Sequence, residues 1–432
     1  MKLKQYQKVY ESIRDDILHG FLKKGDKIAS IRQAAKQFQV SKTTIEKAYY
    51  MLEDEGYIYA CPQKGYFVLV SEDVLVLRKR IIDPIQKESF QYRFDLTKQA
   101  IDKEMFDFSI WKRYLKNVME LQDELVTYGN VIGEQRLRQA LSQYAYRMRK
   151  VFAYPENIIV GASVQVLLYQ VLALQNKKLN IAIHKNGYVQ AKRVMKDLGH
   201  TIVIYETITK DFLQNYHIDM LYIQHPTIYL SEKEKENILL WAKQNNTYII
   251  EDDHNGEFMD YHQIKSAWQK TDMHHMIYIG SFSRLLPSSF RISYIVLPQS
   301  LLEIFHKQKN QYSPSASKIE QLALANYIID GHLERYVRKL AKYYNQKSKQ
   351  VYEILCHIFP YQKIELDTMH LRYLVTVENN VDVDKLNMYL KTNGICLHIS
   401  NRNLMISFVG ISEDDLYQAL QIIKKALTIC KY

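Results

Sequence analysis

Residues 277–298 read IYIGSFSRLLPSSFRISYIVLP. Two runs rich in β-branched and aromatic residues flank a serine-rich segment that contains Arg284, and Arg291 follows seven residues later. Runs of this composition, interrupted by Pro and Ser, are typical of two strands joined by a polar connection. The stretch therefore predicts neighbouring strands whose connection presents hydroxyl groups and a guanidinium at one end of a sheet.

Similar short apolar runs recur along the chain and alternate with helical segments. They are NIIVG, NIAIH, TIVIYE, MLYIQH, TYIIEDD, MIYIGS and ISYIVLP. This alternation predicts an α/β domain with a mostly parallel sheet that binds ligands at the carboxyl ends of its strands. LRYLVTV, ICLHIS and NLMISFVGI, followed by an amphipathic helix, predict a smaller α+β subdomain. We place this domain at residues 94–432, with a large part at about 127–298 and the small subdomain at about 299–432 together with 94–126.

Residues 1–71 follow a different pattern, with helical apolar spacing and short turns. A helix is expected from about Gln5 to His19, a second in IRQAAKQF after Ser30, and a third in KTTIEKAYYMLEDE after Ser41. Two helices that cross at a tight turn in this way are typical of a helix-turn-helix domain. The start of the third helix carries short donors and a cation suited to phosphates and base edges, namely Ser41, Lys42, Thr43 and Thr44.

A hairpin and a charged segment complete the N-terminal part. YIYACPQKGYFVLV alternates like a hairpin with Lys64 and Gly65 at its tip, which predicts a wing that touches the DNA backbone or minor groove. Residues 72–93 combine clustered charge with one proline and no clear period, so we expect a linker between domains.

Composition and charge indicate a folded protein with an anionic partner. An apolar content of 47% argues against a disordered chain, and a formal charge of +11 points to nucleic acid or a phosphorylated ligand. The four cysteines lie far apart without paired spacing, which fits reduced thiols better than a disulfide framework or a zinc site. No stretch is apolar enough for a signal peptide or a membrane span, so we expect a cytoplasmic protein with no membrane partner.

The series VYESIRDDILHGFLKKGDKIASIRQAAKQFQVSKTTIEKAYYMLEDEGYI resembles the winged-helix domain of GntR-type bacterial repressors over its whole length. It departs at Ala29, where the family usually has proline, and at the wing tip CPQKG. The resemblance implies a double-stranded DNA operator as the partner. It also implies DNA contacts by Arg32, Lys42, Thr43, Thr44 and Gly65.

Five ordered motifs in the remainder resemble fold-type I aminotransferases: VTYGNVIGEQRLRQAL, IIVGASVQVLLYQVL, KNGYVQAKRVMKDLG, YIIEDDHNGEF and YIGSFSRLLPSSFRISYIVLP. A winged helix fused to such a domain resembles the MocR subgroup of GntR-type regulators. The resemblance implies a homodimer. It also implies a domain that in the family binds pyridoxal 5'-phosphate, whose aldehyde condenses with a lysine.

The implied cofactor contacts each have a chemical reason. The pyridine nitrogen needs a carboxylate, which matches Asp252, and Tyr188 matches the aromatic that stacks on the ring. A helix-capping Asp252 and a core-filling Tyr188 are the plain structural alternatives. The phosphate needs helix N-terminal amides, hydroxyls and a guanidinium, which the resemblance assigns to Ser163, Val164, Gln165, Ser281, Ser283 and Arg291.

Other positions depart from the family pattern. His254 stands where the family has tyrosine near the ring oxygen, and QHPTIYLS lacks the glycine of a Pro-Thr-Gly turn. The arginine that would bind a substrate carboxylate aligns with Asn403. Arg402 lies one residue away, and on a strand a shift of one residue turns a side chain to the opposite face.

Arg284 stands where the resemblance places the cofactor lysine. A lysine can lose its proton and attack an aldehyde, whereas a guanidinium with a pKa above about 12 cannot. We therefore expect no internal aldimine and no transamination. Arg284 is still suited to a phosphate or carboxylate, so pyridoxal 5'-phosphate would be bound non-covalently at most.

Three functions are consistent with the sequence. The first is a DNA-binding transcriptional regulator whose catalytically inactive aminotransferase-like domain mediates dimerisation and senses a small anionic effector. The second is a pyridoxal phosphate-dependent aminotransferase with a vestigial DNA-binding domain. In the third, the large domain serves only as a dimer platform. The replaced lysine favours the first.

Overall fold

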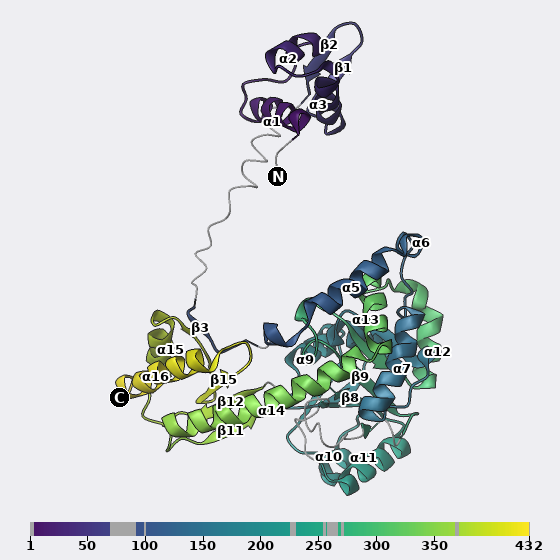
Figure 1. Ribbon diagram of the computed structural model, residues 1–432. Helices are drawn as coiled ribbons and strands as arrows, with labels where there is room; N and C mark the ends of the chain where they lie inside the picture. The colour runs from purple at the N-terminus through teal and green to yellow at the C-terminus, as the bar shows by residue number, and fades with distance from the viewer. Residues whose placement is uncertain are drawn as a thin grey trace. The chain divides into compact units, whose positions relative to one another are not determined.

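The computed structural model describes residues 4–69, 92–98, 101–224, 230–253, 256, 267–268, 272–367 and 371–431 (Figure 1). The chain divides into two compact units, Met1–Phe90 and Gln91–Tyr432. Nearly all of the segment predicted as a linker, 72–93, lies outside the described residues. None of the described helices is both long and apolar enough to cross a membrane.

The N-terminal unit has the predicted helices and hairpin. Its elements are α1 (Gln5–Leu18), α2 (Ile31–Gln37), α3 (Lys42–Asp54), β1 (Ile58–Cys61) and β2 (Gly65–Val68). The two strands are antiparallel, so they form the wing that follows the helix-turn-helix pair.

Local sequence signals set the helix ends in this unit. Ser30 accepts a hydrogen bond from the backbone N–H of Gln33, and Ser41 accepts one from that of Thr44. Caps of this kind stabilise a helix by about 1 kcal/mol each. Gly56 follows α3 with a φ of 75°, in the left-handed region that favours glycine. All three helices and the hairpin contribute to one core, which includes Ile17, Ile45, Leu52 and Val68.

The second unit contains a seven-stranded sheet with the order β4-β10-β9-β8-β7-β5-β6. β10 is antiparallel to β4 and β9, and the other neighbouring pairs are parallel. This confirms the predicted strands and the mostly parallel sheet. The strands are β4 (Ile158–Gly161), β5 (Asn180–His184), β6 (Thr201–Tyr205), β7 (Met220–Gln224), β8 (Tyr248–Asp253), β9 (Met276–Ser281) and β10 (Ser293–Val296).

Helices cover both faces of this sheet. Every residue of β4, β7, β9 and β10 is buried, which explains why their sequences are continuous apolar runs. The helices in this part of the chain are α7 (Gln135–Arg149), α8 (Val164–Ala173), α9 (Val189–Asp197), α10 (Lys210–Asn215), α11 (Glu232–Asn245), α12 (Gln299–Gln308) and α13 (Lys318–Ile329).

A smaller antiparallel sheet has the order β11-β12-β15-β14, and β13 pairs with β3 beside it. α14 (His332–Ile358) extends from the helices of the large sheet to this small sheet (Figure 1). The remaining elements are β3 (Phe94–Asp95), β11 (Ile364–Asp367), β12 (Arg372–Thr376), α15 (Val383–Thr392), β13 (Ile395–Cys396), β14 (His398–Ser400), β15 (Asn403–Ser407) and α16 (Glu413–Ile429).

The structure corrects the predicted extent of the small subdomain. α5 (Phe108–Met119), followed by the short α6 (Gln122–Leu125), packs against α13, which in turn packs against α7. The rings of Trp111 and Tyr114 contact Tyr327 of α13. These helices therefore belong with the large sheet, and so do α12 and α13, which the prediction had also placed in the small subdomain. Of residues 94–126, the segment around β3 joins the small sheet. Apolar spacing shows that a helix buries one face but does not show which layer covers it.

A buried ion pair joins α7 to β8. Arg149 donates to Asp253 through Nε at 2.5 Å and through Nη2 at 3.1 Å, and the Tyr278 hydroxyl donates to the same carboxylate at 2.8 Å. Both charged side chains are at most 5% exposed. Removing one partner leaves the other buried without its counter-charge, which is strongly destabilising.

We predict that Arg149→Met lowers the free energy of unfolding of the second unit by about 3–5 kcal/mol. The measurement is urea denaturation followed by circular dichroism. Arg147→Met is the matched control on the same helix, because the Arg147–Glu334 pair is partly exposed and its loss costs less than about 1 kcal/mol. Equal losses for the two variants would contradict the prediction.

Candidate functional site

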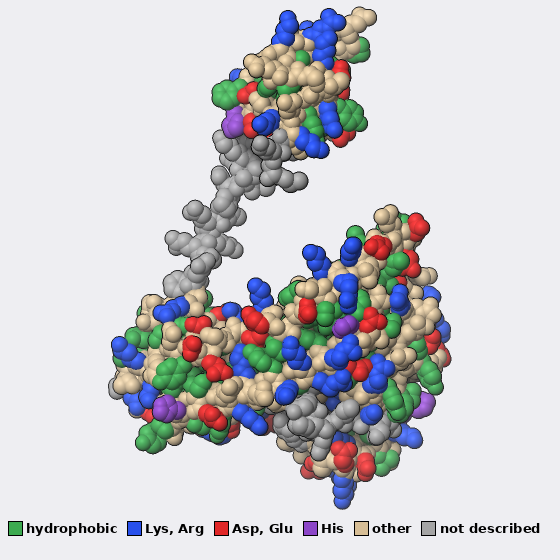
Figure 2. Space-filling view, viewed as in Figure 1, with side chains coloured by type: hydrophobic (Ala, Val, Ile, Leu, Met, Phe, Trp, Pro, Cys, Tyr) green, Lys and Arg blue, Asp and Glu red, His purple; other side chains and the backbone are tan. Residues whose placement is uncertain are grey.

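The N-terminal unit presents cations at the start of its second and third helices. Arg32 on α2 and Lys42 and Thr43 on α3 are exposed, and Figure 2 shows Lys and Arg side chains at several places on this unit. Ser41 has a structural role, since its hydroxyl lies 2.8 Å from the hydroxyls of both Thr43 and Thr44 and caps α3. Arg32, Lys42 and Thr43 are thus the side chains here best placed for phosphates and base edges.

The wing adds further cations. Lys64 at the tip is exposed, and Gly65 has a φ of 105°, which favours glycine. Lys27 forms an isolated β-bridge with Phe67, and its Cε lies 3.3 Å from where a Cβ on Gly65 would be. Lys27 is therefore a wing cation that the sequence pattern did not single out.

The second group of predicted site residues meets at one edge of the large sheet. Ser163 follows β4, Tyr188 follows β5, Asp252 lies near the end of β8, and Ser281 ends β9. Ser281 pairs in register with Ser293 at the start of β10. This is the edge at which ligands bind in sheets of this type.

Asp252 is the buried acid of this edge. Its side chain is 1% exposed and accepts a hydrogen bond from the Tyr222 hydroxyl. Burial and the charge of Asp252 hold the pKa of Tyr222 well above its usual value. Burial also raises the pKa of Tyr188; Asp252 raises it further, and the charges of Arg291 and Arg284 lower it. Tyr188 therefore lies within electrostatic reach of the acid and both arginines.

A cluster of hydroxyl groups lies at the β9–β10 end of the edge. The Ser281 Oγ is 3.0 Å from that of Ser283 and 3.1 Å from that of Ser293. At β4, Ser163 caps α8 by accepting the N–H of Val166 at 3.2 Å. Hydroxyl groups and a helix N-terminus at one sheet edge are suitable donors for a phosphate or carboxylate.

Arg284 is buried, with 9% of its surface exposed. Burial lowers the pKa of its guanidinium to about 10, whereas the charge of Asp367 raises it and that of Arg372 lowers it. Asp367 and Arg372 pair across β11 and β12 and form an ion pair at 2.9 Å. The small sheet thus supplies both an anion and a cation near Arg284, which stays protonated at neutral pH.

The other predicted positions differ in what they can contribute. Val164 is buried in the core, so only its backbone can reach a ligand, whereas Gln165 and Arg291 are exposed. His254 and the turn in QHPTIYLS lie outside the described residues. Within the described part of the chain, no group of His, Cys, Asp and Glu side chains could hold a metal ion.

Arg402 is held by the small subdomain itself. Its Nη2 donates to the carbonyl of Glu378 at 2.6 Å and to that of Val381 at 3.1 Å. Asn403 accepts a hydrogen bond from the Thr376 hydroxyl at 2.9 Å. Arg402 therefore fastens the connection between β12 and α15, and the arginine of this subdomain that acts on Arg284 is Arg372.

The sequence analysis missed several partners at this edge. Ser293 could have been found from the strand register, because the two strands around the serine-rich connection place it opposite Ser281. Tyr222 and the Asp367–Arg372 pair carried no such signal, since their roles depend on contacts between segments far apart in the chain.

Comparisons with known proteins agree with this architecture. Residues 5–68 match the family model of bacterial regulatory proteins of the gntR family. The HTH-type transcriptional regulator YdeL of Bacillus subtilis is 29% identical over 98% of this chain and 97% of its own length. The probable rhizopine catabolism regulatory protein MocR of Rhizobium meliloti is 25% identical over 81% of this chain and 77% of its own length.

The second unit is similar to solved aminotransferase structures. An archaeal alanine:glyoxylate aminotransferase has a TM-score of 0.69 and 18% identity, with 83% of this chain and 95% of that chain covered. A multiple substrate aminotransferase from Thermococcus profundus has a TM-score of 0.67 and 17% identity, with 83% and 95% covered. At such low sequence identity, the structural similarity shows the fold alone.

A winged helix followed by an aminotransferase-like fold defines a class of DNA-binding regulators. This chain is a DNA-binding transcriptional regulator with a gntR-family domain at residues 5–68 and an aminotransferase-like domain, and it is similar to regulators of the MocR and PdxR type.

We predict that Arg402→Met lowers the free energy of unfolding by about 1–3 kcal/mol in the absence of any ligand, because two carbonyls lose a charged donor. Urea denaturation measures the loss. If Arg402 served only to bind a ligand, Arg402→Met would be as stable as the wild type in the absence of ligand. An unchanged unfolding curve would therefore overturn the structural role assigned to Arg402.

Proposed function

We propose that this regulator binds a specific DNA operator as a homodimer, and that its aminotransferase-like domain binds a small anionic effector without forming a covalent bond to it. The observation that carries the proposal is the buried Arg284 at the sheet edge, beside an ion pair from the second sheet. The domain accordingly performs no transamination.

The described side chains at the edge fit the phosphate and the ring nitrogen of pyridoxal 5'-phosphate but not its covalent attachment. The hydroxyl cluster and the start of α8 suit a phosphate, and buried Asp252 suits a protonated ring nitrogen. When bound, the cofactor supplies an electron-withdrawing ring and an aldehyde. Arg284 offers that aldehyde no nucleophile, because its guanidinium stays protonated at neutral pH.

The chain's own residues then act as a binding site and not as a catalyst. Asp252, held in place by the hydrogen bond from the Tyr222 hydroxyl, supplies a buried negative charge at this end of the sheet. Arg284 donates hydrogen bonds to an anionic group of the ligand, and the aromatic ring of Tyr188 covers the ligand. The occupants that suit this arrangement are pyridoxal 5'-phosphate and related phosphorylated or carboxylated small molecules.

Exposed apolar side chains support the homodimer. The segment from α5 to the loop after α6 exposes five large apolar residues within about twenty positions, and Val126 and Tyr128 are 84% and 98% exposed. A patch of this kind is typical of an interface, and a second copy of the chain would bury it with two-fold symmetry. A dimer would also carry two DNA-reading heads for two half-sites. The five residues are Phe108, Met119, Leu121, Val126 and Tyr128.

We predict that Arg32→Ala and Lys42→Ala each weaken operator binding by about 1–3 kcal/mol, because each removes a charged contact to phosphate or guanine. Fluorescence anisotropy with a duplex selected by the full-length chain from a random pool measures the change. Lys36→Ala, an exposed cation at the other end of α2, is the control. If the α2 and α3 variants bound like this control, the assigned contacts would be wrong.

We predict that Arg284→Met abolishes the thermal stabilisation that pyridoxal 5'-phosphate gives the wild-type chain. A ligand at one hundred times its Kd stabilises the native state by about 2.7 kcal/mol. The melting temperature of each protein without ligand is the baseline from which its ligand response is measured. Differential scanning fluorimetry measures both, and Arg402→Met is the control that keeps the ligand response. An unchanged response in Arg284→Met would reject the site.

Arg284→Lys tests whether the rest of the edge is intact. We expect this variant, but not the wild type, to be labelled by pyridoxal 5'-phosphate and borohydride at residue 284, because lysine restores an amine that can lose its proton. Peptide mass spectrometry identifies the labelled residue. Labelling of one specific lysine in the wild-type chain would instead favour the aminotransferase alternative.

A further inference from the structure

Between residues 335 and 350, the exposed face of the long helix α14 carries no negative charge; the exposed Glu353 follows it. Between residues 335 and 350, eight side chains of this helix are exposed, five of them cationic and three of them amides. They are Arg335, Arg338, Lys339, Lys342, Asn345, Gln346, Lys349 and Gln350. We call this set the basic face of α14.

The basic face is a continuous stripe. Its members recur every three or four residues, so they lie on one side of the helix. From Arg335 to Lys349 the stripe is about 21 Å long at 1.5 Å per residue. This length exceeds what a small effector can contact, and it matches several consecutive phosphates of a nucleic acid strand.

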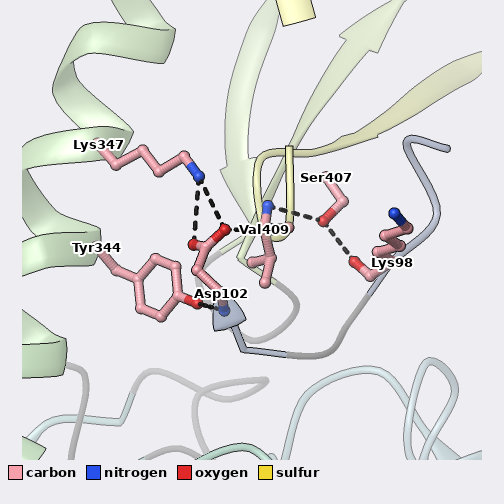
Figure 3. Close-up of polar contacts among 7 residues, drawn as sticks. Lys98, Asp102, Tyr344, Lys347, Ser407 and Val409 are labelled. Atoms are coloured by element: carbon pink, nitrogen blue, oxygen red, sulfur yellow. Dashed lines mark hydrogen bonds and ion pairs between the residues drawn. The ribbon is translucent and has the colours of Figure 1, made fainter. Parts of the chain in front are cut away.

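The cations of this face have no carboxylate partners among the residues that the structure describes. Two neighbours on the same helix show the contrast. Lys347 is buried and donates to Asp102 at 3.2 Å and 3.3 Å (Figure 3). Glu334, on the flank of the stripe, is paired with Arg147. Glu104 and Glu413 lie near the Lys349 end of the face, where they line a cavity with Gln346, Lys349 and Gln350, so the most positive part of the face is at Arg338, Lys339 and Lys342.

A second helix extends the positive surface. α5 exposes Lys112, Arg113 and Lys116. Burial lowers the pKa of His332 at the start of α14, and the charges of Arg335 and Arg113 lower it further. The ring of Tyr114, next to Arg113 on α5, lies 5.9 Å from that of His332, so the two helices adjoin there; Asp330 and Asp107 also act on this imidazole.

We propose that the basic face of α14 binds the phosphate backbone of DNA that flanks the operator. This proposal rests on the DNA-binding function. A mixture of Arg, Lys and amide side chains is what proteins use for phosphate contacts, which carry no sequence information. Because the winged helix belongs to the same chain, its binding raises the local concentration of DNA around the second unit.

The test compares two triple variants with the same change in net charge. The first is Arg338→Gln, Lys339→Gln and Lys342→Gln. The control is Lys210→Gln, Lys233→Gln and Lys243→Gln, three exposed cations on α10 and α11. Anisotropy titrations over a range of salt concentrations are made with two forms of the selected duplex that differ in length. One form has about 20 flanking base pairs on each side, and the other is trimmed to the footprint of the winged helices.

On the long duplex, we expect the slope of log affinity against log salt to become shallower by up to about 2.7 for each protomer whose basic face contacts the DNA in the first variant, since each lost phosphate contact removes about 0.9. The control keeps the wild-type slope, and trimming the duplex removes the difference. Equal slopes for both variants on the long duplex would overturn the proposal. So would a first variant that binds DNA normally but no longer binds vesicles of anionic lipid.

Failure of this proposal is distinguishable from failure of the DNA-binding assignment. If the α14 contacts are real, the first variant still selects the wild-type sequence from a random pool, because backbone contacts do not read bases. If the winged helix did not read DNA, Arg32→Ala would leave both the selected sequence and the affinity for it unchanged. The α14 variant would still change the affinity.

Discussion

Three consecutive carboxylates at the end of β8 impose the main constraint on the second unit. Glu251, Asp252 and Asp253 are each at most 1% exposed, and a buried charge must be matched by donors if the fold is to be stable. Asp253 is matched by Arg149 and Tyr278, Asp252 accepts from Tyr222, and Glu251 accepts the backbone N–H of Trp268 at 2.9 Å. These bonds tie the central strand to α7, to β7 and β9, and to a distant loop.

Alternation along the strand explains why these acids have different roles. Side chains of successive strand residues point to opposite faces, so Glu251 and Asp253 lie on one face and Asp252 lies on the other. Glu251 and Asp253 make hydrogen bonds that hold the fold together. Asp252 lies on the face where Tyr222 and Tyr188 act on it, so it is the acid of the three that is placed for a ligand.

The sequence predicts the elements better than their grouping. Runs such as TYIIEDD and MIYIGS are both apolar and β-branched, and the polar residues that end them mark the ligand edge of the sheet. The predicted strands and their parallel pairing are confirmed. The placement of α5 was wrong because its amphipathic pattern fits any covering layer. Likewise, Asp367 and Arg372 come near Arg284 only through tertiary packing, which local patterns do not encode.

The position of Arg284 gives a ligand a physical route to influence both sheets. The residue follows β9 of the large sheet, whereas Asp367 and Arg372, whose charges act on it, belong to the small one. An anion bound by Arg284 adds a negative charge next to Asp367, which is unfavourable, and next to Arg372, which is favourable. If such an anion binds as proposed, it changes the interaction between the sheets by the difference of these two energies. A ligand can shift the regulator from one conformation to another only by as much as its binding free energy differs between the two conformations.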